Sequence, residues 1–359
     1  MAGTAPGRRQ GEPRRPTLID VAREAGVSRA TASRVISGSS LVSPEARSRV
    51  LEAIDRIDYL VNVAARTLRT DRSSLVGLLI PGFLNDTFGV IAEQVDERLR
   101  EHGLGLLIGS SGWDQVGDLR VLKSFESRRL DALILAPAVD QSLEFSAEVK
   151  RLKTPAVLLD RELPRLSLDS VLADHRGGML AALGHLASLG HRRVGMAAYG
   201  DEIRPGREMR VGFRQGVAHF DLDPDPRLIV ELSSLHPETG TRAARSLIEL
   251  APTACIIGGP TGVLAACLHE LRTQLGARGW RMPEDMSVVA VGAEVVRVLH
   301  VPTLTTLSRG LRDEGNALAA MIVNRLASPG AEPRVDVHPM RLEIGESTGA
   351  PRRKRPRGQ

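Results

Sequence analysis

The sequence predicts a two-part protein: a small all-α helix-turn-helix head with a hinge helix, joined to an α/β body of two doubly wound lobes. Two patterns predict this fold class. Residues 17–58 carry apolar side chains at helical spacing, whereas from residue 75 onward short apolar runs alternate with helical segments. At 359 residues and 42% hydrophobic content, the chain is long enough for several cores.

The head opens with two short helices and a tight turn in residues 17–37. Thr17 and Asp20 have the spacing of a capping box, Gly26 suits a helix end, and Ser28 suits the cap of a second helix. A helix, a glycine-containing turn and a second helix with polar and basic residues form the helix-turn-helix pattern. A generic helical hairpin in a larger core would share this pattern.

A third helix is expected to follow, with Ser43 as its cap and Pro44 at its first position. Residues 59–70 then carry a short helical segment centred on residues 63–68. About seven residues are too few for a stable isolated helix. We therefore expect this hinge to fold only against a partner, before a polar break at residues 71–74.

In the body, strand–helix alternation with short loops predicts parallel sheets covered by helices. Ligands of such folds bind at the carboxyl ends of the strands, here between the lobes. The expected strands are residues 75–80, 104–108, 132–135, 156–159, 193–197, 228–231, 254–257, 287–291 and 341–344. The expected helices are residues 89–101, 117–127, 143–152, 178–189, 207–220, 237–250, 262–275 and 309–325.

Positive charge gathers at both ends of the chain. Residues 1–72 hold 13 Arg against 8 Asp and Glu, and residues 351–359 hold five basic residues and no acid. Because the whole chain has a net charge of only +5, the remainder carries an excess of acid. A basic head on an acidic body indicates that the head binds a polyanion.

Several other classes of protein are not expected. No run of about 20 apolar residues predicts a membrane span, and the basic N-terminus lacks the apolar core of a secretory signal, so we expect a cytoplasmic protein. Cys255 and Cys267 fit no metal spacing and are expected to be buried thiols. No paired-carboxylate, Ser-His-Asp or phosphate-loop pattern predicts an enzyme, and neither a cofactor nor a metal is expected.

Several long motifs, in the right order, resemble those of the lactose/galactose repressor family of bacterial transcription regulators. They are TLIDVAREAGVSRATASRVISG from Thr17, VSPEARSRVLEAIDRIDY from Val42, N-x-x-A-R-x-L from Asn62, D-x-x-x-G-x-x-x-A-x-x-H-L-x-x-L-G-H-R-R from Asp174, and P-x-L-T-T from Pro302. The resemblance implies a body like that of periplasmic binding proteins, in which the chain crosses between the lobes three times.

The resemblance also implies the domain organisation. It gives a disordered basic arm at 1–15, a helix-turn-helix DNA-binding domain at 16–60, a hinge helix at 61–72, a two-lobed effector-binding and dimerisation domain at 73–345, and a basic tail at 346–359. Lobe one would comprise residues 75–172 and 304–345, and lobe two residues 173–303.

By the same resemblance the protein is a sequence-specific DNA-binding regulator, expected to be a repressor that binds a palindromic operator as a homodimer. One head contacts only a half-site, so a two-fold operator calls for two heads. The expected DNA-contacting residues are Thr17, Ser28, Arg29, Ala30, Thr31, Ser33, Arg34, Asn62, Ala65 and Leu68. The alternative is a solute-binding protein of the two-lobed type without a DNA role, against which the basic head argues.

The resemblance places a small-molecule effector in the cleft between the lobes. The expected effector-binding residues are Phe88, Asp160, Arg161, Arg207, Arg210 and Glu294. Met209, Gly258 and Gly259 stand where relatives carry polar groups that hold sugar hydroxyls. Because unpaired hydroxyls are costly to bury, we expect a small charged or unusual ligand, or none, rather than a simple hexose.

The hinge yields a prediction for Leu68→Ala. Leu68 matches a leucine that relatives insert into the minor groove, where an apolar wedge bends the duplex. We expect the variant to lose operator affinity and DNA bending, measured by circular-permutation gel shift, while non-specific binding and the melting temperature stay nearly unchanged. A variant that melts several degrees lower and still bends its operator would show instead that Leu68 is a core residue.

Overall fold

The computed structural model describes residues 16–36, 41–59, 72–234, 236–279, 281–292, 297 and 302–352. By its internal contacts the chain divides into two compact units, the head (Met1–Ser73) and the body (Ser74–Gln359). The predictions for the arm at 1–15, for most of the hinge with Asn62, Ala65 and Leu68, for Glu294, and for the tail beyond residue 352 lie outside the described residues.

In the described residues of the head, three helices are present where the sequence predicts them. They are α1 (Leu18–Glu24), α2 (Arg29–Ile36) and α3 (Pro44–Arg56). The capping box at α1 is formed, because the Thr17 backbone N–H donates to Asp20 Oδ2 at 2.8 Å. Gly26 follows α1 with φ +63°, and Ser43 accepts from the Ala46 N–H at 3.3 Å to cap α3. Each predicted cap is therefore confirmed.

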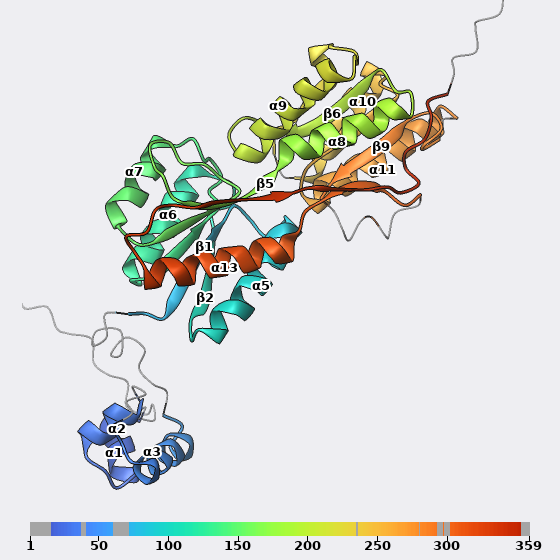
Figure 1. Cartoon of the computed structure of the whole chain (residues 1–359). Coiled ribbons are helices and arrows are strands. Elements are labelled where there is room, and N and C mark those ends of the chain that lie inside the picture. The colour runs from blue at the N-terminus through green and yellow to red at the C-terminus, as the bar shows by residue number, and fades with distance from the viewer. Residues whose placement is uncertain are drawn as a thin grey trace, which may run out of the picture. The chain divides into compact units, whose positions relative to one another are not determined.

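The first sheet of the body is fully parallel and has the strand order β11-β5-β4-β3-β1-β2 (Figure 1). Helices α5 (Asp86–Glu101) and α13 (Leu311–Ala327) cover one face, and α6 (Gln115–Ser127) and α7 (Leu143–Leu152) cover the other. Its strands are β1 (Leu75–Ile80), β2 (Gly105–Ser110), β3 (Ala132–Leu135), β4 (Ala156–Leu159), β5 (Asp169–Asp174) and β11 (Val335–Pro339).

Strand β1 shows why both faces of this sheet are covered. Val76 and Leu78 pack in one core with α5 and α13, and Leu79 packs in the other with α6 and α7. Alternation along the strand thus supplies apolar side chains to two cores at once. A Cβ at Gly77 would lie 2.7 Å from Leu130 Cδ1, so only glycine lets this part of the second core approach the strand.

The second sheet has the strand order β12-β10-β9-β8-β6-β7, with only β12 antiparallel to its neighbour. Helices α8 (His175–Ser188) and α9 (Arg204–His219) cover one face, and α10 (Pro237–Leu250) and α11 (Thr261–Ala277) cover the other. Its strands are β6 (Val194–Tyr199), β7 (Ile229–Leu232), β8 (Ala254–Ile257), β9 (Ser287–Val291), β10 (Thr305–Ser308) and β12 (Arg341–Glu343). The doubly wound, two-lobed fold class is confirmed.

Three strands of the structure are not among the predicted ones: β5, β10 and β11. Strands β5 and β10 carry polar side chains where a buried strand is expected to be apolar. Asp169, Ser170, Thr305 and Thr306 are all buried, so no apolar run marks these strands in the sequence. Strand β11, with the sequence VDVHP, is a mostly exposed edge strand. Elsewhere the predicted elements are present and differ from the observed bounds by a few residues.

The expected lobe boundaries need one correction. Residues 304–345 were assigned to lobe one, but β10 and β12 pair within the second sheet and only α13 and β11 join the first. The chain therefore crosses between the sheets three times: after β5, after β10, and between β11 and β12. Figure 1 shows the last of them as the dark red segment that runs from one lobe to the other.

Candidate functional site

Helix α2 separates its apolar side chains from its polar ones. Ala32 and Val35 are buried in the core of the head with α1 and α3, whereas Arg29, Ala30 and Arg34 are exposed. Positions 29 and 33, and positions 30 and 34, lie one turn apart, so these residues share the outward face. No acidic residue occurs in the helix, so this face is basic.

The hydroxyls at the start of the head helices serve as caps. The Ser28 hydroxyl accepts from the Thr31 backbone N–H at 3.0 Å and lies 2.9 Å from the Thr31 hydroxyl. The Thr17 hydroxyl donates to Asp20 Oδ2 at 2.6 Å. Ser33 is half-buried on the outward side of α2. The capped start of α2 and its exposed arginines therefore form one surface that can contact phosphates and base edges.

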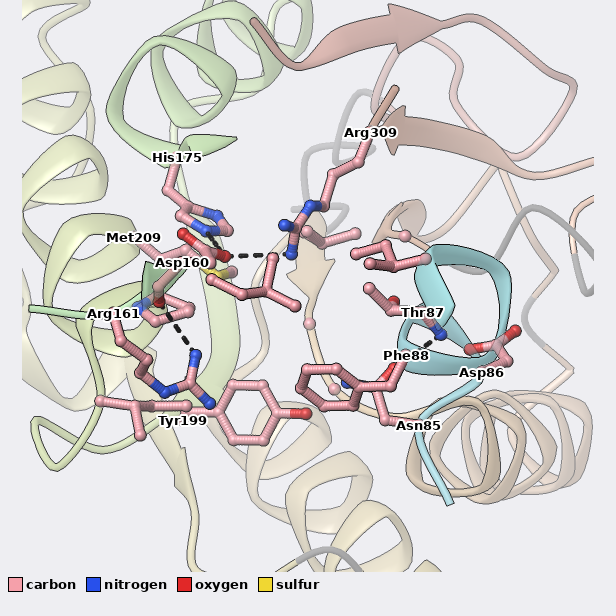
Figure 2. Close-up of a pocket in the computed structure, with 18 of the residues that line it drawn as sticks. Asn85, Asp86, Thr87, Phe88, Asp160, Arg161, His175, Tyr199, Met209 and Arg309 are labelled. Carbon is pink, nitrogen blue, oxygen red and sulfur yellow. Dashed lines mark hydrogen bonds and ion pairs between the residues drawn. The ribbon is translucent and has the colours of Figure 1, made fainter. Parts of the chain in front are cut away.

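The body contains a pocket at the carboxyl ends of its strands, lined by both lobes (Figure 2). Its free volume is about 70 Å³. A second, wider groove of about 600 Å³ shares Trp113, Tyr199 and Ile203 with it. The pocket is lined by Asn85, Asp86, Thr87, Phe88, Ile91, Trp113, Leu159, Asp160, Arg161, His175, Tyr199, Ile203, Pro205, Met209, Gly258, Gly259, Val291, Gly292 and Arg309.

Asp160 lies at the end of β4 and binds side chains from three other segments. His175 Nε2 lies 2.9 Å from Asp160 Oδ2, Arg309 Nη1 lies 3.0 Å from the same oxygen, and Arg204 Nη1 lies 2.9 Å from Oδ1. The Ala173 N–H donates to Oδ1 at 3.3 Å. One buried carboxylate thus connects the segments that follow β5 and β10 with the start of α9.

The charge state of Asp160 follows from these contacts. Burial by itself would raise its pKa, but His175, Arg309 and Arg204 hold the pKa of this carboxyl well below its usual range. Asp160 is 2% exposed, so the carboxylate and its partners are almost fully desolvated. A buried charge of this kind is tolerated only while its partners are present.

Two aromatic rings from different lobes close the pocket on one side. The rings of Trp113 and Tyr199 are stacked, with centroids 6.1 Å apart and an interplanar angle of 19°. Trp113 adopts φ +61° and Asp160 φ +50°, a backbone conformation that costs energy for a bulky residue.

The structure brings together three of the predicted effector residues. Phe88, Asp160 and Arg161 all line the pocket and are buried. In Figure 2, Phe88 and Arg161 lie on opposite sides of the pocket, with Tyr199 between them.

Arg207 and Arg210, also predicted as effector-binding residues, do not line the pocket. Arg207 Nη1 lies 2.7 Å from Asp140 Oδ1, and Arg210 Nη2 lies 2.7 Å from Glu231 Oε2. Met209, between these two residues on α9, lies on the side of the helix that faces the pocket and is 2% exposed. A Cβ at Gly258 would lie 2.8 Å from Met209 Cε, so this wall is packed and apolar.

Several side chains of the site were not predicted from the sequence, among them Trp113, His175, Tyr199, Arg204 and Arg309. His175 directly follows Asp174 in the long motif of the second lobe, and this was a usable signal. Arg309 follows β10, which the sequence did not predict. Only the fold brings these residues to Asp160.

Comparisons with known proteins agree with this architecture. Residues 17–62 match the bacterial regulatory proteins of the lacI family, and residues 183–348 match the periplasmic binding protein-like domain. The HTH-type transcriptional regulator DegA of Bacillus subtilis (strain 168) is 30% identical over 304 residues, which cover 83% of this chain and 88% of that protein.

Solved structures show the same fold. The transcriptional regulator CelR in complex with cellobiose is 26% identical, with a TM-score of 0.69 over 93% of this chain and 100% of that chain. The lac repressor dimer bound to operator and the anti-inducer ONPF is 21% identical, with a TM-score of 0.80 over 94% of this chain and 100% of that chain. At that identity the second likeness concerns the fold alone.

The described ranges contain neither a membrane-spanning helix nor a candidate metal site. There, no helix combines the length and apolar character needed to cross a bilayer. In the same ranges, no group of three or more His, Cys, Asp and Glu side chains is placed to hold a metal ion.

The ion pairs of Asp160 yield a stability prediction. Asp160→Asn removes one carboxylate that Arg204 and Arg309 both bind. Removing one partner of a buried ion pair costs about 3–5 kcal/mol. We expect a loss of this size in the free energy of unfolding at pH 7, measured by urea denaturation. The matched control is Asp86→Asn at the exposed pocket rim, with an expected loss below about 1 kcal/mol.

The ion pairs of Asp160 also predict that the free energy of unfolding depends on pH. Because the folded-state pKa of Asp160 is lowered, its stabilisation is present above the unfolded pKa of roughly 3.9 and is lost as the pH falls through the folded value. Below about pH 4 the wild-type protein should therefore lose stability more steeply than Asp160→Asn. Parallel curves for the two proteins over this range would contradict the assignment.

Proposed function

Because this chain belongs to the LacI family of DNA-binding transcription regulators, we propose that it is a repressor that binds a palindromic operator as a homodimer and responds to a small molecule. The observation that carries the proposal is the exposed basic face of α2, with Arg29 and Arg34, on a capped helix whose opposite face is buried. The guanidinium fork of arginine matches the two acceptors of guanine in the major groove.

Symmetry is the second part of the proposal. One helix-turn-helix head contacts one half-site, so a long specific site requires two heads related by a two-fold axis. The lac repressor, which shares the fold, was solved as a dimer on its operator. We assign dimerisation to the body, as the domain organisation from the sequence implies.

Control by a small molecule is the third part. The pocket is lined by both lobes, so a ligand that fills it changes the free energy of any movement of one lobe against the other. The related CelR was solved with cellobiose, a small molecule. Met209 and Gly258 give this pocket an apolar wall in place of sugar-binding side chains, so we propose an effector other than a neutral hexose.

Selection of bound duplexes from a random DNA pool tests the proposal as a whole. The full-length protein should enrich one sequence with two-fold symmetry, and its binding should weaken steeply with added salt. Recovery of no preferred sequence from several rounds of selection would contradict a sequence-specific role and would favour a solute-binding protein.

Arg34→Ala tests which side chain contacts the bases. Loss of a bidentate contact to guanine costs roughly 1–3 kcal/mol, so the variant should lose its preference at one position in each half-site. Arg49→Ala is the matched control, because it removes an equally exposed positive charge from α3. The control should weaken binding to all sequences alike. An unchanged preference in Arg34→Ala would move the contact to Arg29.

A fragment of residues 1–72 tests the role of dimerisation. The fragment contains the head with its own apolar core, including Val21, Ala32 and Val50. As a single head it should bind duplex DNA weakly and mainly non-specifically, with a strong salt dependence in fluorescence anisotropy. Binding of the full operator as tightly as by the intact protein would show that the body contributes no symmetry.

A further inference from the structure

Arg161 lines the pocket, and its positive charge has no ion-pair partner among the described residues. It is 3% exposed, and its guanidinium donates from Nε to the Pro137 carbonyl at 2.8 Å and from Nη1 to the Asp160 carbonyl at 2.9 Å. Among the described residues, no carboxylate forms an ion pair with it. Burying an unpaired guanidinium costs free energy, so the remaining donors of Arg161 need an acceptor.

Two carboxylates that interact electrostatically with Arg161, Asp160 and Asp140, already bind other groups. Asp160 binds His175, Arg204 and Arg309 through its side chain. Asp140 Oδ1 and Oδ2 accept from Arg207 at 2.7 and 3.2 Å. These carboxylates therefore do not satisfy the donors that Arg161 keeps free.

Further polar atoms of the pocket lack a partner among the described residues. They are Trp113 Nε1, the Tyr199 hydroxyl oxygen and His175 Nδ1, all buried. The indole N–H can only donate, the tyrosine hydroxyl can donate, and the imidazole nitrogen can donate or accept. With Arg161, the unpartnered groups are thus rich in donors, and a ligand that satisfies them is rich in acceptors.

From this set of donors we infer that the effector of the pocket carries an oxyanion, a carboxylate or a phosphate, which binds Arg161 and accepts from Trp113 Nε1 and the Tyr199 hydroxyl. The inference rests on the proposed function, because it names the class of ligand for the same pocket. The guanidinium fork matches both oxyanions, and hydrogen bonds to an ionised acceptor are the strong ones.

The size of the cavities fits this assignment. The free volume of about 70 Å³ is far below the ~300–1,000 Å³ typical of sites that enclose a whole drug-sized ligand. It suits an anionic head group, while the groove of about 600 Å³ beyond Trp113 and Tyr199 has room for the remainder of the ligand. Leu84 and Leu232 give that groove an apolar lining.

The test uses the full-length protein with inorganic phosphate and acetate as probes, glucose as the neutral probe, and sodium chloride at matched ionic strength. Thermal shift and isothermal titration calorimetry measure binding. We expect at least one of the two oxyanions to raise the melting temperature saturably at millimolar concentration beyond the chloride control. Phosphate binding alone assigns a phosphate ester, acetate binding alone a carboxylic acid, and either result supports the inference.

Conservative variants locate the binding. Trp113→Phe and Tyr199→Phe keep an aromatic ring but remove the donor, and Arg161→Gln removes the charge. Since each lost bond to an anion is worth roughly tenfold in affinity or more, each variant should weaken oxyanion binding by at least that factor. Tyr59→Phe, in the head, is the matched control and should bind as the wild type does.

The inference is overturned if neither oxyanion binds beyond the chloride control at about 50 mM, a concentration at which a site with a dissociation constant of a few millimolar is mostly occupied. It is also overturned if glucose binds in their place, or if all three pocket variants bind phosphate and acetate as the wild type does. Gel shift of the selected operator by the same preparations separates this failure from failure of the proposed function. A protein that binds its operator but no oxyanion remains a regulator with a different effector.

Discussion

A desolvated carboxylate joins segments of both lobes of the body. Asp160 leaves the end of a strand in the first sheet and holds His175, Arg204 and Arg309, which belong to segments beyond the first and second crossings of the chain. Coulomb attraction in a water-excluded site is strong, and the cost of burying these charges makes the network intolerant of a missing member. Ion pairs as well as apolar packing therefore hold the second lobe against the first. The pocket lies beside this buried network.

The same burial explains why the pocket is suited to a ligand. Asp160 binds His175, Arg204 and Arg309, and no described protein group accepts from the remaining donors of Arg161, Trp113 and Tyr199. An anion that enters would satisfy them and alter the balance of forces between the lobes. The head forms its own core and presents a basic helix face, so the DNA contacts proposed for it belong to a unit that packs independently of the body.

Much of this architecture could be predicted from the sequence where the signal is local. The caps at Ser28 and Ser43, and apolar strands such as β1, are encoded within a few residues, and all are confirmed. Strands β10 and β11 could not be predicted, because one buries threonines and the other is an exposed edge. Met209 lines the pocket but Arg207 and Arg210 do not, because each residue along a helix changes the direction of the side chain by about 100°. The pairing of Asp160 with Arg309 joins residues far apart in the chain, and no local pattern contains it.

The central claim is that Asp160 holds the two lobes in one arrangement, and a distance measurement tests it most directly. Spin labels at Lys150→Cys in α7 and Thr273→Cys in α11 lie on exposed positions of different lobes, while the native thiols Cys255 and Cys267 are buried. Double electron–electron resonance on labelled protein diluted with unlabelled protein gives the distance within one chain. We predict one narrow distribution for the wild type and a broader, longer one for Asp160→Asn. Superimposable distributions for the two proteins would contradict the claim.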